Sequence, residues 1–297
     1  MAGRLRDLVA AELAEPVDAR VAEMAAALAA QYPGSARAVL FYGSCLRERA
    51  LDGLMLDFYL IVSNYRDAYR GWWLPLANRL VPPNVFPFVH QGLSAKFAVL
   101  SEADFARELG PDARSVSVWA RFAQPSRLVW AADACAKRRI AEQVADAPRT
   151  FFGWTLPMTE GAGDPLAVWR RGFALTYAAE LRAERGVRPG AIVDADPERY
   201  ARFGRAVLDE AADPALPQLP KEEAQGWWRA MQRRGKRLSI LRLAKATTTF
   251  SGGIDYIAWK INRHAGTAIV LKPWQRRWPI TAGLILLPRL LRRGAVR

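Results

Sequence analysis

The sequence has few of the residues on which several common kinds of site and scaffold depend. Of its 297 residues only two are cysteines, Cys45 and Cys135, and only two are histidines, His90 and His264. Two cysteines exclude a disulfide framework and the paired spacing of a zinc site, and they fit a reducing compartment. Two distant histidines argue against a histidine-based metal centre or catalytic triad. The sequence also lacks a run of about 20 apolar residues, so we expect no membrane-spanning helix.

The first residues contain acids and no continuous apolar core, which argues against a signal peptide. We therefore expect a cytoplasmic protein that is peripherally attached to a membrane. Half of the residues are apolar and a quarter are charged, as in a globular protein with a sizeable core.

Positive charge is concentrated near the C-terminal end. The formal net charge is +14, and residues 227–297 hold 16 lysines and arginines against a single acid, Asp255. Tryptophans occur among these basic residues at positions 227, 228, 259, 274 and 278. The apolar stretch 280–287 is too short to span a bilayer. We expect this region to attach the protein to an anionic membrane surface rather than to a nucleic acid. The competing interpretation is a last core helix with a solvated basic end.

Residues 38–62 contain two apolar runs of the length of buried strands, 39–42 and 54–62. Gly43 and Ser44 follow the first run, and Asp57 lies within the second. A carboxylate in an apolar strand is costly unless it pairs with a cation or binds a metal. A strand ending in Gly-Ser, followed by a strand carrying Asp, resembles the opening of the polymerase-β-like nucleotidyltransferases.

Each of these residues suits a phosphate site. Gly43 lets the backbone approach a phosphate closely, and Ser44 offers a hydroxyl donor at the start of a predicted helix. Asp57 would bind Mg²⁺, which prefers oxygen ligands. Many nucleotidyltransferases carry a second acid two residues on, where this chain has Tyr59. The alternative is a structural aspartate beside an ordinary turn.

A third apolar run, 93–101, contains Lys96. A lysine inside a strand needs an anion or an exit to water. Lys96 is therefore a candidate for contacting a triphosphate, and a lysine that reaches solvent at a strand edge is the alternative.

We expect an α+β fold with three regions. Residues 1–131 form a mixed sheet with helices, 132–220 a helical or winged-helix-like middle domain, and 221–297 a basic, tryptophan-rich tail. Further predicted elements are a helix over 3–30, helical structure over 65–80, a break at 82–85, a helix over 102–109, a helix-to-strand segment over 118–130, and helices over 133–147, 165–185, 197–212 and 221–245.

Three blocks in register resemble one family, the mitochondrial-type phosphatidate cytidylyltransferases, which are peripheral CDP-diacylglycerol synthases of the translocator-assembly-and-maintenance family. The blocks are Tyr42-Gly43-Ser44 with Met55-Leu56-Asp57-Phe58, Lys96-Phe97-Ala98-Val99-Leu100-Ser101, and Ala120-Arg121-Phe122-Ala123-Gln124-Pro125-Ser126. They cover roughly residues 38–130. The chain departs from the family pattern at Cys45, at Asn64-Tyr65-Arg66 and at Gln124, and its tail matches only loosely.

The resemblance implies a Mg²⁺-dependent enzyme that makes CDP-diacylglycerol and pyrophosphate from CTP and phosphatidic acid. Asp57 would then hold Mg²⁺, Gly43 and Ser44 would contact the leaving phosphates, and Lys96 and Arg121 would neutralise phosphate charge. Two alternatives stay open: transfer to another lipid or polyprenyl phosphate, and a degenerate, non-catalytic fold that binds membrane or nucleic acid.

Overall fold

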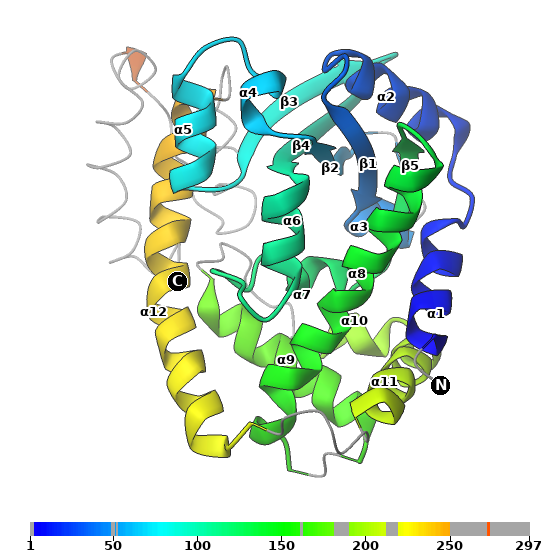
Figure 1. The fold of residues 1–297 in the computed structure, drawn as a ribbon, viewed down its shortest axis with the longest axis vertical. Helices are drawn as coiled ribbons and strands as arrows, with labels where there is room; N and C mark the ends of the chain where they lie inside the picture. Colours follow the sequence, from blue (N-terminus) through cyan, green and yellow to red (C-terminus); the bar gives the residue numbers. More distant parts are fainter. Residues whose placement is uncertain are drawn as a thin grey trace.

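A five-stranded mixed sheet and a set of helices make up the protein, as the computed structural model shows (Figure 1). The structure describes residues 3–48, 51, 53–160, 163–180, 190–211, 219–249 and 272–273. The strands follow the order β3-β4-β2-β1-β5, with β2 and β4 parallel and the other neighbours antiparallel. Their bounds are β1 Ala36–Tyr42, β2 Met55–Val62, β3 Asn84–His90, β4 Leu93–Ser101 and β5 Ser126–Ala131. The predicted α+β class is confirmed.

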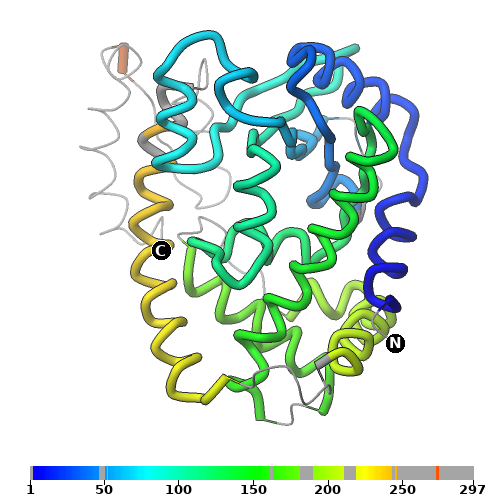
Figure 2. Tube along the Cα trace, in the orientation of Figure 1, coloured from blue at the N-terminus to red at the C-terminus, as the bar shows by residue number. Residues whose placement is uncertain are grey.

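The helices cover both faces of the sheet and extend beyond it (Figure 2). Their bounds are α1 Arg4–Leu13, α2 Ala19–Ala30, α3 Ser44–Glu48, α4 Tyr65–Ala68, α5 Trp73–Leu80, α6 Glu102–Leu109, α7 Trp119–Phe122, α8 Ala134–Thr155, the 3₁₀ turn η1 Leu156–Met158, α9 Pro165–Ala179, α10 Ala191–Asp194, α11 Pro197–Ala211 and α12 Lys221–Thr249. The described residues of 132–220 are helical and contain no strand, as the helical version of the middle domain predicts.

Two of the predicted elements differ from the structure. Residues 3–30 form two helices rather than one, because Pro16 lies between them and cannot continue a helix. The expected break at 82–85 is shorter in the structure, because β3 already begins at Asn84. Pro87 is tolerated in β3 because β3 is an edge strand of the sheet.

Alternating residues of the central strands enter two separate cores. On one face, Val39, Leu60 and Val99 pack with Met24 and Leu28 of α2. On the other face, residues such as Leu40, Ile61 and Leu100 join a larger cluster that continues through α8, α9 and α11 to α12. This cluster crosses the expected bounds at 131/132 and 220/221. The division into three regions stays a prediction.

Two of the tail tryptophans belong to this core. The Trp228 side chain is buried, and its Nε1 donates a hydrogen bond to the carbonyl oxygen of Trp154 at 2.8 Å. Trp227 stacks on the Trp154 ring, with centroids 4.1 Å apart and planes 8° from parallel. Trp228 is therefore a core residue and Trp227 is partly buried against the core, so neither ring supports bilayer contact. Attachment of residues 221–297 to a membrane stays a prediction. The other three tail tryptophans lie outside the described residues, and no helix among those described could cross a bilayer.

The docking of α12 on α9 can be tested with two glycines of the same helix. A Cβ at Gly235 would lie 2.2 Å from the carbonyl oxygen of Ala179, whereas a Cβ at Gly226 would meet nothing within 4 Å. Gly235→Ala should lower the free energy of unfolding by about 1–3 kcal/mol, as overpacking does. Gly226→Ala should raise it by about 0.5–1 kcal/mol, because alanine favours the helix. Urea denaturation measures both, and equal effects would contradict the docking.

Candidate functional site

The candidate site lies at one end of the sheet, where three central strands place charged and aromatic side chains side by side. Asp57 of β2 has Tyr42 of β1 as its register partner on one side and Lys96 of β4 on the other. All three therefore point to the same face of the sheet, the face that carries the larger core. The structure thus brings Asp57 and Lys96 together, as neighbours on parallel strands.

Asp57 and Lys96 form an ion pair, with Lys96 Nζ 3.0 Å from Asp57 Oδ1. The lysine side chain is 26% exposed and the aspartate side chain 18%, so the pair is open to solvent on one side. Each residue supplies the partner that its place in an apolar strand requires. The pair gives each side chain a partner and leaves both charges partly exposed. The predicted roles of Asp57 in binding Mg²⁺ and of Lys96 in binding a triphosphate stay predictions.

Gly43 determines how closely the backbone can approach Asp57. It has φ of +96°, a conformation that side chains other than glycine rarely adopt. A Cβ at this position would lie 2.9 Å from Asp57 Oδ2. Any larger side chain at this position would clash with the Asp57 carboxylate. Glycine is therefore required here even if no phosphate binds. Ser44, which begins the short helix α3, is exposed beside it.

Arg121 of α7 reaches the same end of the sheet. Its guanidinium lies over the Tyr42 ring, 5.0 Å from the centroid, and its Nη1 is 3.4 Å from the hydroxyl oxygen of Tyr59. Burial acts to lower the pKa of Arg121, but Tyr42, Tyr59, Glu180 and Asp57 raise it by more. The guanidinium therefore stays charged, and it interacts electrostatically with the Asp57 carboxylate. The site thus contains one carboxylate, Asp57, and two positively charged side chains, Lys96 and Arg121.

Two further basic side chains, which the sequence did not single out, come from α12, and one of them reaches the loop that contacts Arg121. Arg242 donates from Nη1 to Ser117 Oγ at 2.7 Å and from Nε to the carbonyl oxygen of Pro82 at 2.7 Å. Lys245 donates to the carbonyl oxygens of Val81 and Pro83. Arg121 Nη1 lies 3.4 Å from the carbonyl oxygen of Ser117. Ser117 therefore contacts one arginine from α7 and one from α12.

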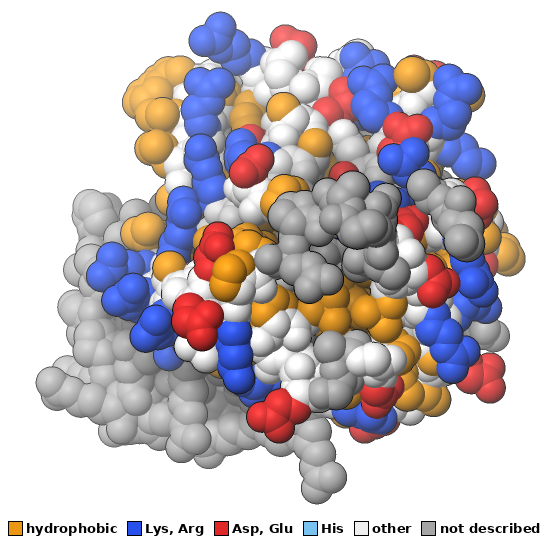
Figure 3. All heavy atoms as spheres, turned by 60° about the horizontal axis from the view of Figure 1, so that its bottom comes forward, with side chains coloured by type: hydrophobic (Ala, Val, Ile, Leu, Met, Phe, Trp, Pro, Cys, Tyr) orange, Lys and Arg blue, Asp and Glu red, His pale blue; other side chains and the backbone are white. Residues whose placement is uncertain are grey.

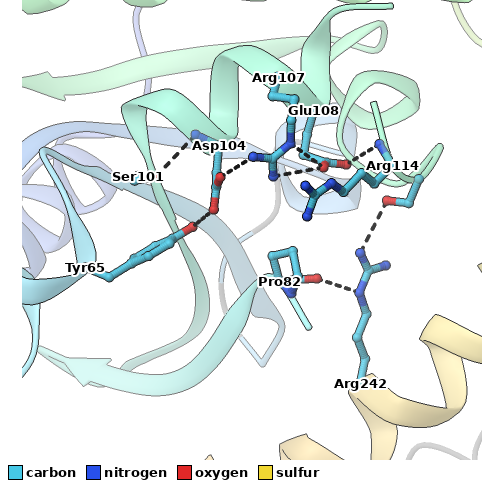
Figure 4. A network of polar contacts seen from close by, with 9 residues as sticks. Tyr65, Pro82, Ser101, Asp104, Arg107, Glu108, Arg114 and Arg242 are labelled. Atoms are coloured by element: carbon cyan, nitrogen blue, oxygen red, sulfur yellow. Dashed lines mark hydrogen bonds and ion pairs between the residues drawn. The ribbon is translucent and has the colours of Figure 1, made fainter. Parts of the chain in front are cut away.

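The loop that contains Ser117 follows a polar network on α6 (Figure 4). Asp104 accepts hydrogen bonds from the Tyr65 hydroxyl and from Arg107, and Glu108 accepts one from the backbone of Arg114. Arg242 reaches the end of this network through Ser115 Oγ, at 3.3 Å. These bonds hold α6, the loop and α12 in a fixed relation to the sheet.

A resident metal would need more ligands than the described residues provide. They contain no group of three or more histidine, cysteine or carboxylate side chains close enough to hold an ion. Mg²⁺, however, usually keeps waters and substrate phosphates as ligands and takes only one or two carboxylates from the protein. Oδ2 of Asp57, which does not face Lys96 in the 3.0 Å contact, suits that limited role. The donor set fits a Mg²⁺ ion that arrives with a polyphosphate.

Comparison with known proteins adds little. No family model and no curated protein matches the chain. Among solved structures, the chain is similar to a nucleotidyltransferase-like protein from Exiguobacterium sibiricum, with a TM-score of 0.30 and 10% identity over 92% of both chains. At that TM-score the likeness carries no argument, so the site has to be interpreted from its own geometry.

The contact between Gly43 and Asp57 can be tested against a second glycine of positive φ. Gly34 has φ of +73° and open space where a Cβ would be. An alanine at either position costs about 1–2 kcal/mol, because its Cβ disfavours a positive φ. Only Gly43→Ala also displaces the Asp57 carboxylate. We expect the larger loss of unfolding free energy at Gly43. In an Asp57→Ala background, Gly43→Ala should lose no more unfolding free energy than Gly34→Ala. The loss caused by Gly34→Ala should be the same in both backgrounds. Additive effects at Gly43 would contradict the contact.

Lys245 should make the stability of the protein depend on pH. Burial first, and then the neighbouring Arg242, lower the pKa of Lys245 to about 7. The unfolded chain therefore binds more protons than the folded protein between about pH 7 and pH 10, and the free energy of unfolding should rise with pH in that range. Lys245→Gln should flatten this rise in urea titrations at pH values from about 6.5 to 9. The exposed Lys236→Gln is the control, and parallel curves for both variants would refute the assignment.

Proposed function

We propose that the protein is a Mg²⁺-dependent nucleotidyltransferase that transfers CMP from CTP to the phosphate of phosphatidic acid, giving CDP-diacylglycerol and pyrophosphate. The observation that carries the proposal is the group formed by Asp57, Lys96 and Arg121 at the end of the sheet, beside the Gly43-Ser44 turn. The choice of CTP and phosphatidic acid rests on the family resemblance of residues 38–130.

The reaction needs positioning and charge neutralisation more than proton transfer. An oxygen of the lipid phosphate attacks the α-phosphorus of CTP, and the bond from that phosphorus to the bridging oxygen breaks as pyrophosphate leaves. A phosphate monoester carries close to two negative charges near neutral pH, so its oxygen is already nucleophilic. The site can therefore work without a histidine base.

Each residue has a distinct part in this scheme. Lys96 and Arg121 supply fixed positive charge for the triphosphate, in a partly desolvated place where such charge is most effective. Asp57 orients the Lys96 ammonium through the 3.0 Å contact. Ser44 offers an exposed hydroxyl, and Gly43 keeps the turn free of a side chain. A Mg²⁺ ion bound by Asp57 and the phosphates would add charge stabilisation for the leaving group.

A second candidate is a non-catalytic protein of the same fold. One observation favours it: the Asp57–Lys96 pair satisfies both charges without any ligand. In that case the ion pair would be structural, as are Arg199 and Glu12, which form a buried pair between α11 and α1. The two candidates differ in what happens when both members of the pair are removed.

The proposed activity is tested by incorporation of labelled CMP from CTP into phosphatidic acid with Mg²⁺. ATP, GTP and UTP, and a polyprenyl phosphate acceptor, serve as the comparison arms. Product with CTP and phosphatidic acid supports the proposal. Turnover only with the polyprenyl phosphate, or only with another nucleotide, would show that the enzyme uses that acceptor or nucleotide instead. No product with any pair would support the non-catalytic candidate.

Asp57→Asn and Lys96→Met should each lower turnover by about 100-fold or more, because each removes charge used in the transition state. Asp112→Asn and Lys137→Met, at exposed positions, are the matched controls and should keep normal rates. The double variant Asp57→Asn/Lys96→Met distinguishes the roles. If the pair is catalytic, the double variant should be inactive and should have a normal melting temperature. Recovery of activity in the double variant would show that the pair is only structural.

A further inference from the structure

The short helix α5 buries an amide side chain and exposes several large apolar side chains. Its buried residue is Asn78, which donates from Nδ2 to the carbonyl oxygen of Val99 at 2.9 Å and accepts a bond from the backbone N–H of Asn84. Asn84 in turn donates to the carbonyl oxygen of Leu74 at 3.1 Å. Amide hydrogen bonds therefore attach α5 to the sheet, together with Leu74, which packs against the core that contains α2.

The other large apolar side chains at this helix face outward. Trp72 is 79% exposed and Leu80 67%, and Trp73 and Leu76 are also exposed. Trp72, Leu76 and Leu80 follow one another at intervals of four residues, so they share one face of the helix. A continuous apolar face of this kind marks an interaction site more often than scattered surface residues do.

A basic surface adjoins this face. Arg242 and Lys245 of α12 bind the backbone of Val81, Pro82 and Pro83, directly after α5. The next residue to Arg242 is Leu241, which is exposed like the apolar residues of α5. On α12, Arg234 and Arg237 are exposed and precede Leu241 by seven and four residues, which places them on its face. From residue 224 to the end of α12 there are seven basic residues and no acid.

We propose that α5 and the adjoining face of α12 form a docking surface for an anionic lipid bilayer. We call it the α5/α12 surface and define it by Trp72, Trp73, Leu76, Leu80, Leu241, Arg234 and Arg237. Tryptophan and leucine beside arginine are the composition of elements that lie in a membrane interface. Figure 3 shows an apolar group at the upper left of the molecule next to a row of lysine and arginine side chains.

Charge complementarity selects the lipid surface over a second copy of the chain. The α12 side of the surface is basic throughout, so two copies meeting there would bring like charges together. An anionic bilayer supplies the opposite charge and an apolar layer at once. None of these residues belongs to the candidate site, so docking does not need the proposed activity.

The test is flotation of the full chain with vesicles of phosphatidylcholine, with and without phosphatidylserine, in the absence of nucleotide. Leu76→Gln/Leu80→Gln and Arg234→Glu/Arg237→Glu should each weaken binding to the anionic vesicles by about tenfold or more. Val89→Gln, an equally exposed apolar position on β3, and Arg205→Glu, exposed on α11, are the matched controls and should bind normally. High salt should reduce the binding of the wild-type protein.

Three results would overturn the proposal. Unchanged vesicle binding in both double variants would place the membrane contact elsewhere. A lower melting temperature of Leu76→Gln/Leu80→Gln with unchanged binding would show that other residues of this chain cover α5. Loss of self-association in that variant, measured by sedimentation, would identify a second copy as the occupant. Normal flotation of inactive Asp57→Asn, together with weak flotation of the α5 variant, would separate this surface from the catalytic proposal.

Discussion

The ion pair between Asp57 and Lys96 is the constraint on which the end of the sheet depends. Two charged side chains stand inside apolar strands, and each would be costly alone. The parallel register of β2 and β4 places them opposite each other, so each charge meets its counter-charge at 3.0 Å. The parallel pairing itself requires a crossover, and α4, α5 and β3 occupy that connection. The charged site and the unusual helix α5 thus arise from the same piece of topology.

The sequence identified the strands of this site because their apolar runs have the length of buried strands. Asp57 and Lys96 stood out because each broke such a run. What the sequence could not show was that they are partners, since that depends on two distant strands being adjacent and parallel. The same limit applies to Arg242 and Lys245, which only the packing of α12 brings to residues 81–83 and 117. The local sequence pattern therefore identified Asp57 and Lys96, but only the tertiary structure shows which residues they contact.

The C-terminal region shows what composition alone leaves undecided. A basic segment with tryptophans was interpreted as an anchor, yet Trp227 and Trp228 pack in the core beside Trp154. Helix α12 has a buried side and a strongly basic exposed side, and a count of residues along the chain cannot separate the two. Conversely, the sequence predicted helical structure over 65–80 but could not reveal that Asn78 is the buried residue of α5.

Helix α12 connects the two functional proposals physically. Its buried side is fixed by Trp228 and by the close approach of Gly235 to α9, so its position is set by the core. From that position Arg242 reaches Ser117, and the carbonyl oxygen of the same serine lies 3.4 Å from Arg121 at the candidate site. Arg237 and Arg234, one and two turns earlier on α12, are exposed and share a face with Leu241. A bilayer bound at that face would therefore be held by the same rigid helix that contacts the loop beside Arg121, which keeps the lipid surface and the site in a fixed geometry.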